Sequence, residues 1–317
     1  MKKPRSTDRL DDAARAGWLY YVAGITQDEI ARRLNVSRPT AQRLVSLALS
    51  EKLITFRLDH PVAACMELAA KLTERFGLRY CDVTPADAES DSEVVGIAEA
   101  AAAFLEQKLA TPEPTVIAVG TGRTLRAAVE QVPRMTRRQH KLVSLVGHIS
   151  MEGAGSFYDV LARLSDLTQA PHFPMPLPVV VPSPEERDQL IRLEPVRRLR
   201  DLAEAAEVTL VGVGRMDESA QLRMDGFISD AELSEMHRLG AVGEIVGWSF
   251  DTSGRILSGG INERLTSVPL EAPAQRTVVA VAQGPAKVLA IRGALVGRLV
   301  NGLITNETTA RSLLDLG

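Results

Sequence analysis

Two cations, Arg123 and Lys287, stand where helices are expected to begin. The segment Gly120-Thr121-Gly122-Arg123-Thr124 follows the apolar run Thr115–Val119 and precedes helix-forming residues. A helix N-terminus carries partial positive charge, which disfavours a cation and favours an anion. Glycines also allow close backbone approach, and hydroxyl and N–H groups can point at a docked molecule. The segment therefore predicts contact with an anionic or polyhydroxylated ligand, with a salt bridge to a protein carboxylate as the alternative for Arg123.

Two further segments resemble the first. Gly212-Val213-Gly214-Arg215 follows another apolar run, and Pro285 is suited to the first position of a helix. Lys287 then lies in the first helical turn, as a second cation placed against the helix dipole. Two such cations predict a shared ligand, whereas the alternative is solvated cations on ordinary strand-to-helix turns. The sequence has no GxxxxGK[ST] motif and no GxGxxG after the first strand, so neither a P-loop nor a dinucleotide site is expected.

Carboxylates lie between these segments. Glu244 and Asp251 flank an alternating stretch that predicts a hairpin turning at Thr252-Ser253-Gly254. Carboxylates accept hydrogen bonds from the hydroxyls of a polyol, although a solvated hairpin charge is the alternative for Asp251. The five histidines show no metal-ligand spacing, and we expect neither a metal nor a cofactor. The segment "PHFPMPLP" is predicted to be a rigid connection.

The elements that position these residues alternate along the chain. Helical stretches are predicted at 66–76, 91–110, 157–168 and 194–205. Short apolar runs lie at 115–119, 142–146, 179–181, 208–213, 277–281 and 303–305. This alternation predicts a Rossmann-like α/β domain with a mainly parallel sheet, over residues 58–317. Ligands of such sheets bind where the carboxyl ends of strands meet the following loops.

Residues 1–57 differ in charge and pattern. They hold 11 Lys and Arg against 6 Asp and Glu, a charge of +5, whereas the remainder carries −8. We predict helices at 8–24, within "ITQDEIARRL", and within "NVSRPTAQRLVSLALS". Thr26 and Glu29 match a capping box, and Ser37 is the expected N-cap of the last helix. A basic all-α unit with a short helix, a tight turn and a second helix is typical of a helix-turn-helix that binds DNA.

The last helix has two faces. Ala41, Leu44, Val45 and Ala48 follow the i, i+3, i+4, i+7 rule of a buried stripe, and the opposite face is polar. The predicted DNA-binding residues are Thr26, Gln27, Arg38, Pro39, Thr40, Gln42, Arg43 and Ser46. The alternatives are a plain helical hairpin with solvated charges, or a head that binds protein.

Composition limits the remaining classes. The chain has 317 residues, of which 45% are hydrophobic and 24% charged, as in ordinary globular proteins. No stretch of 18 apolar residues and no apolar N-terminal region is present, so we expect no membrane span, no signal peptide and a cytoplasmic protein. Cys65 and Cys81 lie outside any CxxC spacing and are expected to be reduced thiols.

The ordered set of motifs resembles the SorC family of bacterial sugar-responsive transcriptional regulators over nearly the whole chain. The resemblance rests on "GITQDEIARRLNVSRPTAQRLVSLALSEKLI", "VGTGRTL", "GEIVGWSFDTSGRIL" and "AQGPAKVLAIRGALVGRLVNGLITNETTARSLL", together with the stretch from "LPVVVPSPEERDQL" to "VTLVGVG". It implies a helix-turn-helix joined to an effector domain similar in fold to sugar-phosphate isomerases and glucosamine-phosphate deaminases. It also implies homo-oligomers, commonly tetramers assembled from dimers, whose operator binding is tuned by the effector.

The resemblance also assigns residues. The family's glycine-threonine loop falls on 120–124, its GGxxK lysine on Lys287, and the Glu of its Gly-Glu-Ile stretch on Glu244, which we expect near the sugar. His148 and Gln283 stand where the family often has glycine, and both add side chain at the pocket rim. The predicted effector-binding residues are Gly120, Thr121, Gly122, Arg123, Thr124, His148, Gly212, Gly214, Arg215, Glu244, Asp251, Gln283 and Lys287.

The sequence thus predicts a DNA-binding regulator of a carbohydrate or polyol catabolic operon, controlled by a sugar, sugar alcohol or sugar phosphate. We expect operator DNA, the effector and further copies of the chain as partners, and no enzymatic activity. The alternatives are a sugar-phosphate isomerase- or deaminase-like enzyme with an appended helical domain, and a scaffold that binds no DNA.

Overall fold

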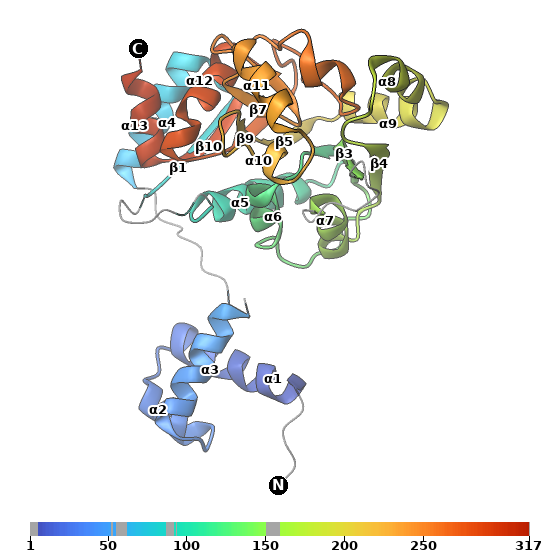
Figure 1. The fold of residues 1–317 in the computed structure, drawn as a ribbon. Coiled ribbons are helices and arrows are strands. Elements are labelled where there is room, and N and C mark those ends of the chain that lie inside the picture. The colour runs from blue at the N-terminus through green and yellow to red at the C-terminus, as the bar shows by residue number, and fades with distance from the viewer. Residues whose placement is uncertain are drawn as a thin grey trace. The chain divides into compact units, whose positions relative to one another are not determined.

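The computed structural model describes residues 6–51, 53–54, 62–86, 92, 94–149 and 159–316. The chain divides into two compact units, Met1–His60 and Pro61–Gly317, whose elements are labelled in Figure 1. The predicted boundary between residues 57 and 58 lies outside the described residues.

The first unit is helical throughout its described elements. It consists of α1 (Ser6–Gly17), the π-helical turn η1 (Trp18–Val22), α2 (Gln27–Arg33) and α3 (Arg38–Ser50). A single helix over 8–24 was predicted, but the α-helix ends at Gly17. The Ala23 N–H then donates to the Trp18 carbonyl, five residues back, which is the wider π pattern.

The caps of α2 and α3 follow the sequence closely. Thr26 Oγ1 accepts from the Glu29 N–H at 3.4 Å, but the Glu29 carboxylate pairs with Arg32 and Arg33, so half of the predicted capping box forms. Ser37 Oγ accepts from the Thr40 N–H at 3.4 Å, which confirms the predicted N-cap of α3.

The predicted buried stripe of α3 lies in the core of the first unit. Its members pack with buried residues of α1 and α2. The fully or nearly buried set is Ala13, Ala16, Ile30, Ala31, Ala41, Leu44, Val45 and Ala48. Because these are mostly small side chains, the three helices approach closely.

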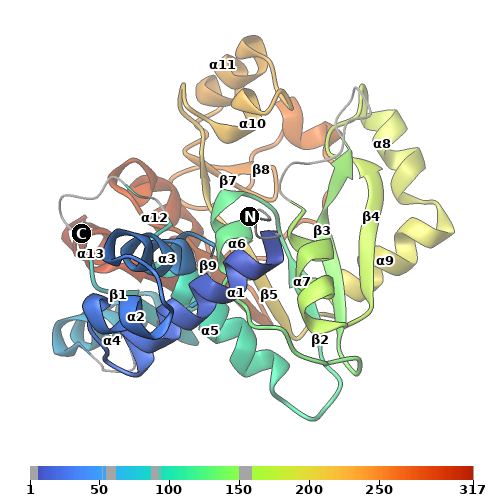
Figure 2. The same cartoon turned by 90° about the horizontal axis from the view of Figure 1, so that it is seen from below.

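The second unit is built on a seven-stranded sheet whose described pairings are all parallel. The strand order is β1-β10-β9-β5-β2-β3-β4, and Figure 2 shows β2, β3 and β4 as neighbours. The strands are β1 (Tyr80–Thr84), β2 (Val116–Val119), β3 (Lys141–Ile149), β4 (His172–Pro178), β5 (Val208–Gly212), β9 (Thr277–Val281) and β10 (Gly302–Asn306). A second, antiparallel sheet joins β6 (Gly214–Arg215), β7 (Gly243–Ile245) and β8 (Trp248–Phe250). The predicted α/β class with a mainly parallel sheet is confirmed.

Helices cover both faces of the large sheet. One face packs against α5 (Ile97–Leu109), α6 (Arg123–Val129) and α7 (Val160–Thr168). The other packs against α4 (Ala63–Phe76), α9 (Glu194–Glu204), α12 (Val288–Val296) and α13 (Glu307–Asp315), and Figure 1 shows α4, α12 and α13 across the sheet from α5 and α6. The remaining elements are α8 (Pro184–Ile191), α10 (Gln221–Met224), α11 (Asp230–Arg238), η2 (Gly260–Arg264) and η3 (Pro285–Lys287).

Two predicted elements near β4 were wrong. The "PHFPMPLP" segment, expected to be a connection, contains strand β4, whereas 179–181 is no strand and Val180 makes a single bridge to Leu265. β4 is the edge strand and pairs with β3. An edge strand tolerates proline because its outer N–H groups have no ladder partner to lose.

Two predicted helix starts were also too early. The helix expected from residue 91 begins at Ile97, because Gly96 has a φ of 84° and Glu99 closes a capping box on its N–H. The helix expected from residue 157 begins at Val160 with Asp159 as N-cap, and 157–158 lie outside the described residues.

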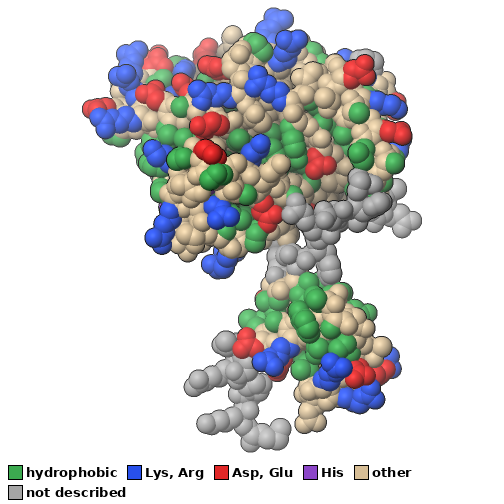
Figure 3. All heavy atoms as spheres, turned by 180° about the vertical axis from the view of Figure 1, so that it is seen from behind, with side chains coloured by type: hydrophobic (Ala, Val, Ile, Leu, Met, Phe, Trp, Pro, Cys, Tyr) green, Lys and Arg blue, Asp and Glu red, His purple; other side chains and the backbone are tan. Residues whose placement is uncertain are grey.

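One face of the second unit mixes charges. On the face shown in Figure 3, acidic and basic side chains are interspersed, so it lacks the one-sided basic surface typical of nucleic-acid binding. Within the described part of the chain, no helix combines the length and apolarity needed to cross a bilayer.

Candidate functional site

The large sheet changes direction between β2 and β5. From β2 the chain continues to β3 and β4 on one side, while β5, β9 and β10 follow on the other. The loops after β2 and β5 therefore leave in opposite directions and open a crevice at the carboxyl edge of the sheet. This is the place where open α/β sheets bind ligands.

A cavity of about 130 Å³ lies in this crevice. Its walls come from strands β3 and β7, from the loops after β2, β4, β5 and β9, and from residues 221–227. Eight of the predicted effector-binding residues line it: Thr121, Gly122, Arg123, Thr124, Gly212, Gly214, Glu244 and Lys287. The structure thus brings together segments that lie up to 166 positions apart, from Thr121 to Lys287.

The loop after β2 is shaped by glycine. Gly122 is the N-cap of α6 with a φ of 116°, a left-handed conformation that favours glycine, and Arg123 is the first residue of the helix, as predicted. The Gly120 N–H donates to the Leu210 carbonyl at 2.9 Å and holds the loop against β5. The first turn of α6 and the Arg123 side chain are therefore presented at the cavity.

Glu244 is positioned by the small sheet. It pairs with Gly214 across β6 and β7, and its Oε2 accepts from the Gly247 N–H at 2.7 Å. A Cβ atom at position 214 would lie 1.9 Å from Glu244 Oε1, so glycine there makes room for the carboxylate. Burial raises the pKa of Glu244, while the Gly247 hydrogen bond and the charge of Lys287 oppose that rise.

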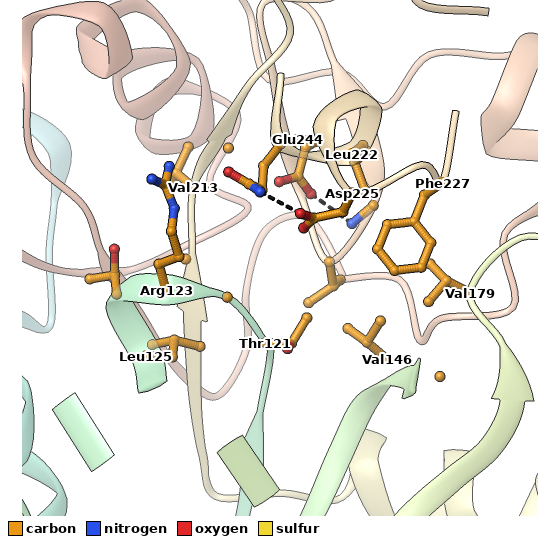
Figure 4. A pocket seen from close by; sticks show the side chains of 18 of the residues that line it. Thr121, Arg123, Leu125, Val146, Val179, Val213, Leu222, Asp225, Phe227 and Glu244 are labelled. Atoms are coloured by element: carbon orange, nitrogen blue, oxygen red, sulfur yellow. Dashed lines mark hydrogen bonds between the residues drawn. The ribbon is translucent and has the colours of Figure 1, made fainter. Parts of the chain in front are cut away.

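Sequence reasoning missed part of the cavity wall. Gln221, Leu222, Asp225 and Phe227 line it, together with apolar residues from β3 and the start of the loop after β4. Figure 4 shows Arg123 and Phe227 on opposite sides of the cavity, with Asp225 and Glu244 between them. The missed residues lie in a polar stretch without strong periodicity. No local signal could have found them, because they reach the cavity through the tertiary pairing of Gly214-Arg215 with Gly243-Glu244.

Four of the remaining predicted residues do not line this cavity. Gly120 borders a neighbouring hollow, with Asp159 and His172. Arg215 turns to Asp217, with Nε 3.2 Å from Oδ1. Gln283 is 2% exposed, and its Nε2 donates to the carbonyls of Ser92 and Val95.

Asp251 has a local structural contact instead. Its Oδ1 accepts from the Ser253 and Arg255 N–H groups at 2.9 and 3.0 Å, so it caps the turn at 252–254. That turn closes a single bridge between Phe250 and Ile256, whereas the β7–β8 hairpin turns at 246–247. The predicted turn at 252–254 is therefore present, with Phe250 and Ile256 as antiparallel partners, and the turn at 246–247 is an additional one that the sequence did not predict. The side chain of His148 lies outside the described residues.

The helix-turn-helix presents the predicted polar face of α3. Arg38, Pro39, Gln42, Arg43 and Ser46 are exposed, and Thr40 is half-buried at the border. Thr26 is exposed and Gln27 half-buried at the start of α2. Arg38 Nε lies 3.3 Å from Asp28 Oδ1, and both side chains are exposed, so solvent weakens this pair.

Known proteins match this architecture. The family described as "Putative sugar-binding domain" matches residues 60–315. The erythritol catabolism regulatory protein EryD of Brucella abortus is 34% identical over 302 residues, which cover 95% of this chain and 96% of EryD. The transcriptional regulator LsrR of Klebsiella pneumoniae is 32% identical over 311 residues, covering 96% and 92% of the two chains. Among solved structures, the full-length sorbitol operon regulator SorC of Klebsiella pneumoniae gives a TM-score of 0.69 at 24% identity over 97% of this chain and 99% of SorC.

These matches define the class of protein. The chain belongs to the SorC family of sugar-binding transcriptional regulators, which confirms the resemblance. It is a transcriptional regulator under the control of a small-molecule effector.

Proposed function

We propose that the protein binds operator DNA through α3 and a sugar, sugar alcohol or sugar phosphate in the cavity beside β2 and β5. Occupancy of the cavity changes the affinity for the operator. The observation that carries this proposal is the presence, in one chain, of a helix-turn-helix with an exposed polar face and a cavity at the switch point of a parallel sheet. The name of EryD, which refers to erythritol catabolism, favours a polyol or a related carbohydrate.

The DNA contact is assigned to the exposed face of α3. Arg43 and Gln42 have side chains that pair with base edges in the major groove. Arg38 releases Asp28 and pairs with a DNA phosphate when DNA is bound. This exchange is easy because an exposed ion pair such as Arg38–Asp28 contributes little to stability. Thr26 and Gln27, at the start of α2, contact the sugar-phosphate backbone of the DNA, because the first helix of a helix-turn-helix crosses that backbone.

The protein acts as a homo-oligomer, a dimer or a tetramer. Two helix-turn-helix units then meet operator half-sites one helical turn, or a multiple of it, apart. The oligomer has one arrangement of its helix-turn-helix units that fits the operator and another that does not. The effector controls the affinity for DNA because it binds these two arrangements with different affinities.

The proposed role includes no turnover. Relatives over most of the chain are named as regulators, which supports this assignment. Incubation with sugar phosphates should leave them unchanged, whereas isomerised or deaminated product at catalytic protein concentrations would favour the enzyme alternative.

The experiment combines two readouts on the purified full-length chain. A thermal-shift screen covers sugars, polyols and their phosphates, because a ligand at 100 times its Kd adds about 2.7 kcal/mol of stability. Fluorescence anisotropy then measures the affinity for DNA from the promoter regions next to its gene, with and without each hit. A stabilising compound that shifts DNA affinity supports the proposal. Stabilisation without any effect on DNA, or DNA binding that is independent of salt, would refute it.

A further inference from the structure

One wall of the cavity is not positioned by the large sheet. Residues 216–242 connect β6 to β7 and form an excursion away from the small sheet. The strand pairs Gly214–Glu244 and Arg215–Gly243 close the base of this excursion. α10 and the residues after it supply Gln221, Leu222, Asp225 and Phe227 to the cavity. The excursion therefore faces the loop after β2 across the site.

The excursion is fixed by polar contacts at several points. Arg223 pairs with Asp230, and Ser229 and Glu232 form a reciprocal capping box at the start of α11. Glu232 also pairs with Arg264 of η2, and His237 Nε2 donates to the Met216 carbonyl. Residues 221–227 thus lie between two anchored points, Met216 and the start of α11.

Asp225 and Gln221 form a hydrogen-bonded pair on this wall. Gln221 Nε2 donates to Asp225 Oδ1 at 2.6 Å, which orients the carboxylate. Asp225 is exposed and so stands at the mouth, and Figure 4 shows it on the same side of the cavity as Glu244. An oriented carboxylate keeps its second oxygen as an acceptor, and ligand hydroxyls are matching donors.

The rest of the cavity suits the carbon skeleton of such a ligand. Phe227, Val179 and Val146 provide apolar surface near Asp225, as Figure 4 shows. A polyol or sugar has C–H groups for this surface and hydroxyls for the carboxylates. Ligand sites typically combine a mainly apolar lining with a few placed polar groups in this way.

Charge narrows the class of ligand further. Among the described residues that line the cavity, the ionisable side chains are Arg123, Lys287, Asp225 and Glu244, two cations and two carboxylates. An uncharged ligand leaves this balance unaltered. A phosphate at the mouth would bring negative charge against Asp225, which costs binding energy.

We infer that Asp225, oriented by Gln221, is a specificity-determining residue that binds the hydroxyls of an uncharged polyol or sugar and disfavours a phosphate ester at the mouth. This inference rests on the proposed function, because it names the ligand class of the same cavity. Asp225 acts by accepting hydrogen bonds, and Gln221 is the positioning residue behind it.

The test is titration calorimetry on the full-length protein and its variants. The probes are free sugars and polyols of four to six carbons, including erythritol, xylitol and sorbitol, and their terminal phosphate esters. Wild type should bind a free compound at least about tenfold more tightly than its ester. Asp225→Asn should weaken binding of the free compound about tenfold or more, because a hydrogen bond to a charged group is lost. Asp225→Asn should also reduce the ratio of the affinity for the free compound to the affinity for its phosphate ester. A purely structural role of Asp225 would leave that ratio unchanged.

Glu218→Gln is the matched control. Glu218 is exposed on the same excursion, outside the cavity lining, and the change also removes one carboxylate. It should bind every probe as wild type does. Gln221→Leu provides a second variant if Asp225→Asn unfolds, and it should weaken binding of the free compound less than Asp225→Asn.

The outcomes separate this inference from the proposed function. The inference is overturned if wild type binds only the phosphate esters tightly. It is also overturned if Asp225→Asn and Gln221→Leu both keep the ligand preference of wild type. In either case the proposed carbohydrate-controlled regulator stands. Failure of wild type to bind any free compound or ester overturns the proposed function, and the inference with it.

Discussion

The helix-turn-helix and the proposed effector cavity are built in opposite ways. The polar face of α3 comes from one continuous helix between Arg38 and Ser46. The cavity gathers residues from β3 and β7, from the loops after β2, β4, β5 and β9, and from the excursion at 216–242. The first site depends on helical periodicity, whereas the second depends on strand order and on where distant segments cross.

The two units also differ in what stabilises them. The core of the first unit is mostly alanine, with Ile30, Leu44 and Val45 as its larger members. The second unit packs two apolar layers, one on each face of its sheet. Because small domains bury less of their surface, the first unit should tolerate less damage. Four variants test this difference between the two units.

The largest effect is expected from Ile30→Ala. Ile30 is fully buried in the first unit, and truncation of such a side chain costs about 2–5 kcal/mol. The first unit should unfold and operator binding should be lost, while the second unit still binds its effector. Calorimetric unfolding and anisotropy measure the two effects, with Ile30→Val as the milder control. Loss of effector binding in Ile30→Ala would mean that the second unit does not fold independently of the first.

Arg43→Ala tests the polar face of α3 without touching the core. If Arg43 makes a base contact, operator affinity should fall by about 1–3 kcal/mol, and effector binding should stay as in wild type. Arg15→Ala is the control, because Arg15 is an exposed arginine of α1. Equal operator affinity for Arg43→Ala and wild type would remove Arg43 from the DNA site.

Lys287→Ala tests the cavity in the same manner. Loss of a charged hydrogen-bond donor should weaken the effector response about tenfold and leave effector-free operator binding unchanged. Lys71→Ala on the exposed surface of α4 is the matched control. The dose–response of DNA release or binding against effector provides the measurement. A response like that of wild type would exclude Lys287 from recognition.

The smallest effect concerns pH. Burial raises the pKa of Glu244 above its ordinary value of 4.5, so the folded state holds this proton to higher pH than the unfolded state. The free energy of unfolding therefore falls as pH rises from about the unfolded pKa through the folded pKa. Glu244→Gln should lack this contribution and lose less stability than wild type between pH 4.5 and neutrality, as measured by urea unfolding. Parallel pH profiles for the two proteins would show that Glu244 titrates normally.

Several local features could be predicted from residues alone. The caps at Thr26 and Ser37, the buried face of α3 and the cation at the start of α6 all depend on neighbours within a turn or two. The parallel sheet could also be predicted, because helical and apolar stretches alternate along the chain. Residues 121–124 of the family's glycine-threonine loop and Lys287 line the cavity, whereas Gly120 borders the neighbouring hollow.

Tertiary structure decided the rest. The place of β4 at an edge allows a proline-rich strand that local propensity argues against. The pairing of β6 with β7 brings Asp225 and Gln221 to the cavity, while Arg215 and Asp251 satisfy their charges locally. The physical reason is range: caps and helix faces depend on interactions between close neighbours in sequence. The lining of a cavity depends on contacts between segments whose separation carries no local signal.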